Sequence, residues 1–157
     1  MSMLPPCAFF DSAAQQGMST CGVFIKTTDE QSFEIHWNAS HGFNNRAEAV
    51  ALAGLLSFCT FLDIEMSHIY RDSKLIIDHV LSKHNIENIH LAGWLDKIVA
   101  LWNIKENYTI SHTARSNNRE ADALSKKGLT SPLGVWRMQI KMANNCFQIQ
   151  DFRLPDI

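Results

Sequence analysis

Hydrophobic and polar positions divide the chain into short apolar or alternating runs, which predict strands, and longer runs with a helical repeat, which predict helices. Three strands are predicted first, at residues 7–10, 20–26 and 32–37. In the third of these, Phe33, Ile35 and Trp37 alternate with polar residues. Residues 12–19 are small or polar, so we expect a turn there. Such short links predict an antiparallel meander.

Helices and strands then follow each other along the chain. The pattern predicts helices at residues 45–62, 73–82, 91–102 and 118–127, and strands at residues 67–71 and 108–112. In the first helix, Leu52, Cys59 and Leu62 recur at helical spacing and form an inward stripe. This order indicates an α/β fold whose five-stranded mixed sheet has three antiparallel and then two parallel strands, flanked by helices.

A β-hairpin is predicted at residues 133–153, where apolar and polar residues alternate again. We expect one domain over residues 1–130, and residues 131–157 as a hairpin extension packed on that same domain. A docking surface for a partner is the alternative role of the hairpin. The chain enters a strand almost at once, which favours a domain cut from a longer polypeptide.

Composition and charge narrow the function classes. The 157 residues are 46% hydrophobic and 19% charged, which is typical of a soluble globular domain. The formal net charge is −2, so contacts to phosphate must come from local geometry or bound metal. The four scattered cysteines favour neither a zinc knuckle nor a disulfide framework. No apolar run reaches the roughly 18 residues of a membrane span, and we expect an intracellular protein of the nucleus or cytoplasm.

Glu48 is the first candidate for chemistry, because it lies on the inward stripe one turn before Leu52. A buried carboxylate is costly unless a cation meets it. The alternative is a capping box, in which Asn45 caps the helix and Glu48 reaches back to its N–H. Asn44 can also serve as the cap.

Three aspartates lie at the ends of predicted elements. Asp11 ends the first strand, Asp72 ends the fourth strand, and Asp122 lies in the first turns of the last helix. Considered singly, they fit a turn residue, a helix N-cap and a solvated helix face. If the first and fourth strands are parallel neighbours, however, Asp11 and Asp72 lie together at their carboxyl ends, where α/β sheets bind ligands.

Four carboxylates gathered in this way require cations. Each like-charge pair at about 4 Å costs on the order of 4 kcal/mol at an effective dielectric of 20. Oxygen ligands without a His or Cys set favour Mg²⁺ or Mn²⁺ over zinc. Two such ions about 4 Å apart stabilise both the attacking and the leaving oxygen of a phosphodiester.

The chain resembles the type 1 ribonuclease H family over roughly residues 7–128. The resemblance is carried by Phe10-Asp11-Ser12, Asn44-Asn45-Arg46-Ala47-Glu48, Arg71-Asp72-Ser73, and the run from His112 through Asn118-Arg119-Glu120-Ala121-Asp122-Ala123-Leu124. It implies that two Mg²⁺ ions, which Mn²⁺ can replace, are held by the four carboxylates of Asp11, Glu48, Asp72 and Asp122. It also implies that His112 assists proton transfer or product release.

The same resemblance implies hydrolysis of the RNA strand of an RNA–DNA hybrid, a choice that rests on contacts to 2′-hydroxyls. The family positions that touch the hybrid correspond to Asn44, Asn45, Ser73 and Lys74. Lys74 is equally explained as a solvated helix charge. Ser12 stands where the family usually has glycine, and its side chain could crowd a closely approaching nucleic acid.

The layout looks most like the plant and retroelement branch, whose domains often follow a reverse transcriptase. The span between Asp72 and His112 leaves no room for the extra basic substrate-binding helix of some members. A catalytically weak or inactive module that binds nucleic acid or braces a larger protein is the alternative function. A proofreading-type exonuclease is disfavoured because it expects glutamate at the position of Ala13.

Overall fold

The computed structural model describes residues 5–41, 44–65, 68–71, 96, 98–102, 109–142 and 147–153. Its strands are β1 (Cys7–Gln15), β2 (Met18–Lys26), β3 (Ser32–His41), β4 (His68–Arg71), β5 (Thr109–His112), β6 (Trp136–Lys141) and β7 (Phe147–Phe152). Its helices are α1 (Asn44–Phe61) and α4 (Arg119–Lys127), with short 3-10 turns η1 (Arg115–Asn117) and η2 (Gly128–Thr130).

The strands form one seven-stranded sheet in the order β5-β4-β1-β2-β3-β6-β7. The meander β1-β2-β3 is antiparallel, whereas β4 pairs parallel to β1 and β5 pairs parallel to β4. The predicted mixed sheet with its five strands is therefore confirmed. The C-terminal hairpin continues the same sheet, because β6 pairs antiparallel to β3 and β7 pairs antiparallel to β6.

The turn predicted at residues 12–19 is wrong. β1 runs on to Gln15 and β2 begins at Met18, so only Gln16 and Gly17 form the loop. Both have positive φ, 51° and 76°, as two-residue hairpin loops require. The strand extension is held by backbone pairing and by a bond of 3.0 Å from Gln15 Nε2 to Thr20 Oγ1. Its small and polar side chains carry no hydrophobic alternation, which is why sequence pattern missed it.

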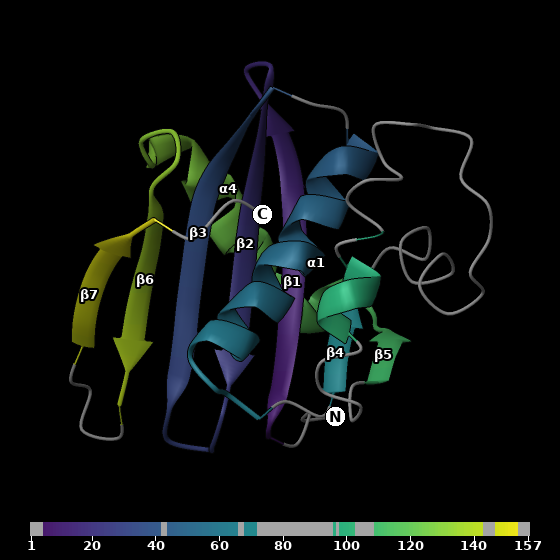
Figure 1. Ribbon diagram of the computed structural model, residues 1–157, viewed down its shortest axis with the longest axis vertical. Helices are drawn as coiled ribbons and strands as arrows, with labels where there is room; N and C mark the ends of the chain where they lie inside the picture. The colour runs from purple at the N-terminus through teal and green to yellow at the C-terminus, as the bar shows by residue number, and fades with distance from the viewer. Residues whose placement is uncertain are drawn as a thin grey trace.

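Helices cover the two faces of the sheet (Figure 1). α1 crosses one face and buries the main core, in which Phe10, Val23 and Leu52 are fully buried. The helical residues 98–102 contribute Ile98 to this core. α4 covers the other face, where Ala121 packs with Cys7 and Phe9 in a smaller cluster.

Aromatic packing joins the hairpin to the main core. The rings of Trp37 on β3 and Trp136 on β6 stack with centroids 3.6 Å apart, and Phe58 of α1 packs edge-on against Trp136. α1 approaches this pair at Gly54, where an added Cβ would lie 2.6 Å from the Trp37 ring. The hairpin thus shares one core with the sheet.

The helix predicted at residues 73–82 and the first part of that at 91–102 fall outside the described residues. Within the described part of the chain, no helix is both long enough and apolar enough to cross a membrane.

Candidate active site

Asp11 lies midway along β1, opposite Gly22 of β2, and is only 5% exposed. Its Oδ1 accepts a hydrogen bond of 2.7 Å from the Ser12 N–H and forms an ion pair with Nη1 of Arg71. The prediction placed Asp11 at the end of its strand. The strand instead continues past it, because residues 12–15 pair with β2.

Glu48 comes to the same place from α1. Its side chain is 14% exposed, and Oε1 forms an ion pair with Nη2 of Arg71. The predicted helix begins at residue 45, which puts Glu48 in its first turn. The helix instead begins one residue earlier, at Asn44, so Glu48 directly follows the first turn, which holds no acidic residue.

Arg71 is the cation that the burial of Glu48 requires. It ends β4 and is 3% exposed, and its guanidinium joins the carboxylates of Asp11 and Glu48. Nη1 also donates to the Phe10 carbonyl at 3.3 Å, and Cζ lies 5.5 Å from the centre of the Phe10 ring. Sequence reasoning missed this role. The sequence offers no local signal for it beyond a basic residue that follows Ile69 and Tyr70 and directly precedes Asp72.

Asn118 ties α4 to the same strand. It is fully buried immediately before α4, and its Nδ2 donates to the Phe10 carbonyl at 3.3 Å. α4 lies close to the sheet because Gly22, the partner of Asp11, has no side chain: an added Cβ would lie 2.3 Å from the Ser125 nitrogen. The N-terminal end of α4 is thereby fixed against β1.

Asp122 does not join the pair of buried carboxylates. Its side chain is 41% exposed and forms an ion pair of 3.2 Å with Lys126, one turn on. This contact is typical of a solvated helix face, the alternative weighed from sequence. Among the residues that the structure describes, no three His, Cys, Asp or Glu side chains gather into a group that could hold a metal.

His112 is the last residue of β5 and lies opposite Arg71 in the parallel ladder, with its side chain exposed. The backbone beyond it is fixed by a hydrogen bond of 2.8 Å from the Thr113 N–H to the Arg71 carbonyl. His112 therefore lies two strands away from Asp11, with β4 between them, and its side chain faces solvent.

The remaining predicted site residues are only partly described. Asp72, Ser73 and Lys74 fall outside the described residues, as do the side chains of Asn44 and Asn45 at the start of α1. Ser12 is half-buried on β1, opposite Cys21.

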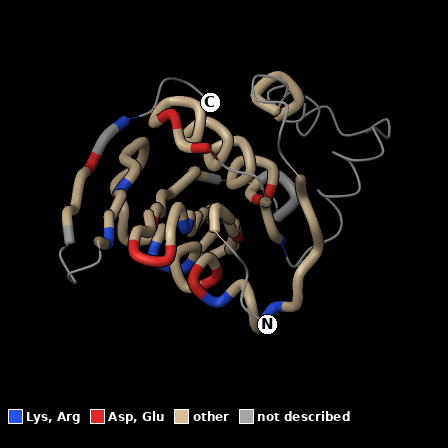
Figure 2. Tube along the Cα trace, turned by 90° about the horizontal axis from the view of Figure 1, so that it is seen from below, with Lys and Arg blue, Asp and Glu red and all other residues tan. Residues whose placement is uncertain are grey.

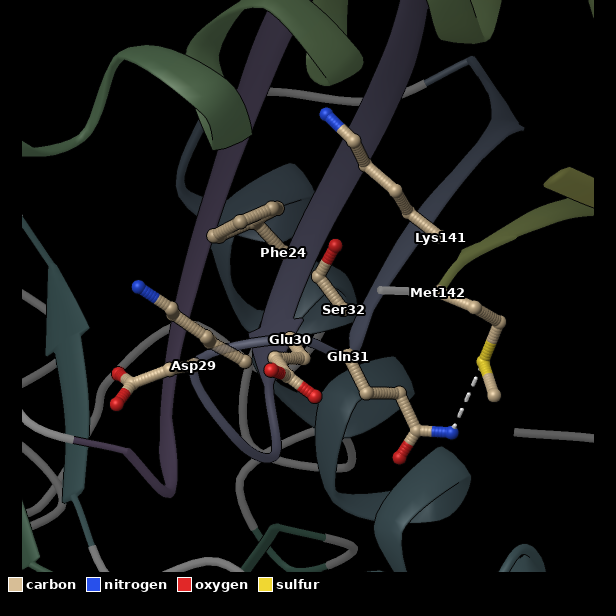
Figure 3. Close-up of a pocket in the computed structure, with 8 residues that line it drawn as sticks. Phe24, Asp29, Glu30, Gln31, Ser32, Lys141 and Met142 are labelled. Carbon is tan, nitrogen blue, oxygen red and sulfur yellow. Dashed lines mark hydrogen bonds between the residues drawn. The ribbon is translucent and has the colours of Figure 1, made fainter. Parts of the chain in front are cut away.

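Two surface features lie apart from these residues. Basic and acidic residues are interspersed over the described part of the chain (Figure 2). A hollow at the turn between β2 and β3 is lined by Phe24, Lys26, Asp29, Glu30, Gln31, Ser32, Lys141 and Met142 (Figure 3). Gln31 Nε2 contacts Met142 Sδ there at 3.4 Å. Among the predicted site residues that the structure describes, none lines this hollow.

Comparison with known proteins places the chain in a family. The model of the reverse transcriptase-like family matches residues 9–128. The chain belongs to the reverse transcriptase-like family. No curated protein matches it. The match spans the strands and helices that carry Asp11, Glu48 and Asp122.

Solved structures show the same fold. RNase H1 from Halobacterium salinarum is 23% identical with a TM-score of 0.70, and the match covers 79% of this chain and 96% of that one. LC11-RNase H1, isolated from compost and solved with an RNA/DNA hybrid, is 22% identical with a TM-score of 0.67. This match covers 79% of this chain and 96% of that one.

The prototype foamy virus protease-reverse transcriptase is 12% identical with a TM-score of 0.61, and the match covers 82% of this chain and 22% of that one. The predicted resemblance to type 1 ribonuclease H is confirmed at the level of the fold.

Proposed function

We propose that this chain is a ribonuclease H, which uses divalent metal to hydrolyse the RNA strand of an RNA–DNA hybrid. One observation carries the proposal: on a ribonuclease H fold, α1 brings Glu48 to Asp11 of β1, and both carboxylates are held at one buried cation. A fold needs no such pair for its stability, because buried ion pairs rarely contribute more than apolar packing would. The pair is therefore better explained by function.

The donor set fits a hard divalent cation. The carboxylates of Asp11 and Glu48 offer oxygen ligands only, which Mg²⁺ and Mn²⁺ prefer. We propose that Asp72 and Asp122 complete the set, as the family resemblance implies. When bound, two such ions supply an activated water and stabilise the departing 3′ oxygen.

The other proposed roles belong to side chains around this pair. His112, exposed at the end of β5, is positioned to exchange a proton with solvent or to assist product release. The residues that would bind the hybrid are Ser12, Asn44, Asn45, Ser73 and Lys74. Hydrogen bonds from their side chains to 2′-hydroxyls would distinguish RNA from DNA. Support for the substrate comes from LC11-RNase H1, whose structure contains an RNA/DNA hybrid.

A retroelement context is proposed on the family and on the viral match. We infer a reverse transcriptase domain N-terminal to this one in the parent protein, acting in the nucleus or cytoplasm. Residues 1–130 would then be the ribonuclease H-like domain, with residues 131–157 as an extension that the β3–β6 pairing supports.

An inactive module is the second candidate, and Arg71 favours it. An arginine that pairs with both Asp11 and Glu48 offsets part of their negative charge and allows them to remain buried without metal. Asp122, facing Lys126, adds no third carboxylate to the pair.

Cleavage of a labelled RNA–DNA hybrid in Mg²⁺ or Mn²⁺ separates the two candidates. For the nuclease, Asp11→Asn should lower the cleavage rate at least about 100-fold, because each metal ligand supports several kcal/mol of transition-state stabilisation. Asp151→Asn is the matched control, since it removes the same charge from an exposed carboxylate on β7. Equal rates for the wild type and Asp11→Asn would refute the site, and cleavage of duplex DNA but not hybrid would refute the substrate.

A further inference from the structure

The most unusual group near the candidate site is the guanidinium of Arg71. It is a full positive charge with a side chain only 4% exposed, and it lies between two carboxylates from different elements. The proposed chemistry gives this side chain no task. Burying an arginine is costly unless its charge is compensated, so its surroundings should explain why it stands there.

Arg71 is held in its place by several independent contacts. One end of its planar fork reaches Asp11 and the Phe10 carbonyl, the other end reaches Glu48, and the Phe10 ring lies beneath the plane. Such a fork fixes the positions of both carboxylates at once, which the single ammonium of a lysine does less well. The position is built for a cation shared by Asp11 and Glu48.

We propose that Arg71 is a resident counter-ion that competes with divalent metal for Asp11 and Glu48. The inference rests on the function proposed above, in which these two carboxylates hold metal. The guanidinium occupies Asp11 Oδ1 and Glu48 Oε1, so a divalent ion bound to the same two oxygens would lie directly beside a full positive charge and be repelled by it. Metal therefore binds fully only when the guanidinium leaves the pair.

The device has two consequences. Without metal, Arg71 removes the repulsion between Asp11 and Glu48 and stabilises the folded protein. When metal is present, only the molecules in which the arginine has left the pair can bind it. The apparent affinity for metal is therefore the intrinsic affinity multiplied by the fraction of such molecules. If Arg71 stays paired in about nine molecules out of ten, about one in ten can bind metal, and the apparent affinity for metal falls about tenfold. The metal concentration at which the enzyme becomes active would then be set by Arg71.

Calorimetric titration of the full chain with MgCl₂, and separately with MnCl₂, tests this competition. Arg71→Gln should bind metal about tenfold more tightly than the wild type. It should also melt at a lower temperature than the wild type without metal and gain more thermal stability when metal is added. Arg137→Gln is the matched control, because it removes an arginine paired with Asp151 on the surface hairpin. Its metal affinity should equal that of the wild type.

The outcomes separate the inference from the function on which it rests. Equal metal affinity of wild type and Arg71→Gln overturns the competition but leaves the nuclease intact, provided the hybrid is cut. Absence of metal binding by both proteins, even with hybrid present, overturns both proposals.

If Arg71→Gln does not fold, Arg71→Lys tests the competition in its place. It keeps the charge but loses the fork, so its affinity for metal should lie above that of the wild type. An affinity at or below the wild-type value would refute the competition. In the wild type, the side-chain N–H signals of Arg71 in an NMR spectrum should shift as Mg²⁺ saturates the site, and unchanged signals at saturation would equally refute it.

Discussion

His36 makes the stability of this protein depend on pH between about pH 4 and pH 6.5. It lies on β3, shares a hydrogen bond of 2.8 Å between its Nδ1 and Ser131 Oγ, and has a pKa lowered from 6.5 to about 4. Burial is the main cause, and the nearby charges of Arg137 and Lys127 lower the pKa further, against the attraction of Asp151. His36 is therefore neutral in the folded protein at pH values where the unfolded chain is protonated.

The sign and size of the effect follow from linkage. Between pH 6.5 and pH 4 the unfolded chain binds the extra proton, so the free energy of unfolding falls as the pH falls through this window. The shift of about 2.5 pKa units corresponds to at most about 3.4 kcal/mol at 1.36 kcal/mol per unit. Because the imidazole is only partly buried, solvent screening reduces this, and we expect about 2 kcal/mol.

Urea unfolding at a series of pH values from 4.5 to 7.5 measures the effect. The informative quantity is the difference in unfolding free energy between the wild type and His36→Gln, which cancels all other titrations. As the pH falls, the wild type should lose about 2 kcal/mol of unfolding free energy relative to His36→Gln. Arg137→Gln should show a smaller pH dependence, because it removes one of the charges that lower the pKa. A difference that does not vary with pH would refute the assigned environment of His36.

Further predictions concern packing and surface charge. Gly22→Ala should lower the unfolding free energy by about 3 kcal/mol in chemical denaturation, because its Cβ would meet the α4 backbone. Gly134→Ala is the comparison: its Cβ would lie in open space, and the positive φ of 77° should cost only about 1 kcal/mol of unfolding free energy. Trp136→Ala should lose about 3–5 kcal/mol, and a loss below 1 kcal/mol would show that the hairpin does not share the core. A double-mutant cycle on the exposed Arg137–Asp151 pair should give only a weak coupling, because solvent screens an ion pair at the surface.

The sheet could be predicted because its signals are local. Alternation in residues 32–37 and the apolar run before Asp11 identify their strands, and the helical stripe through Leu52 identifies α1. The length of the first hairpin could not be predicted, since residues 12–15 are held by backbone bonds that leave no pattern in side chains.

The candidate site was harder to predict than the fold. Motif order was enough to place Asp11 and Glu48 as candidates, and the structure brings these two together. The pairing of Asp122 with Lys126 follows the helix repeat and could have been predicted from a separation of four residues. The position of Arg71 could not, because its partners are 60 and 23 residues away and depend on how α1 packs on the sheet.

The stacking of Trp37 on Trp136 has a practical consequence for work with shortened proteins. The family match ends at residue 128, before β6 begins, so a truncation at that point would look natural from alignment alone. It would strip the cover from an indole that is now 2% exposed and would leave the backbone of β3 unpaired along one side. An uncovered hydrophobic strand of this kind is a template for intermolecular association, so a shortened protein that retains the hairpin should aggregate less than one that ends at residue 128.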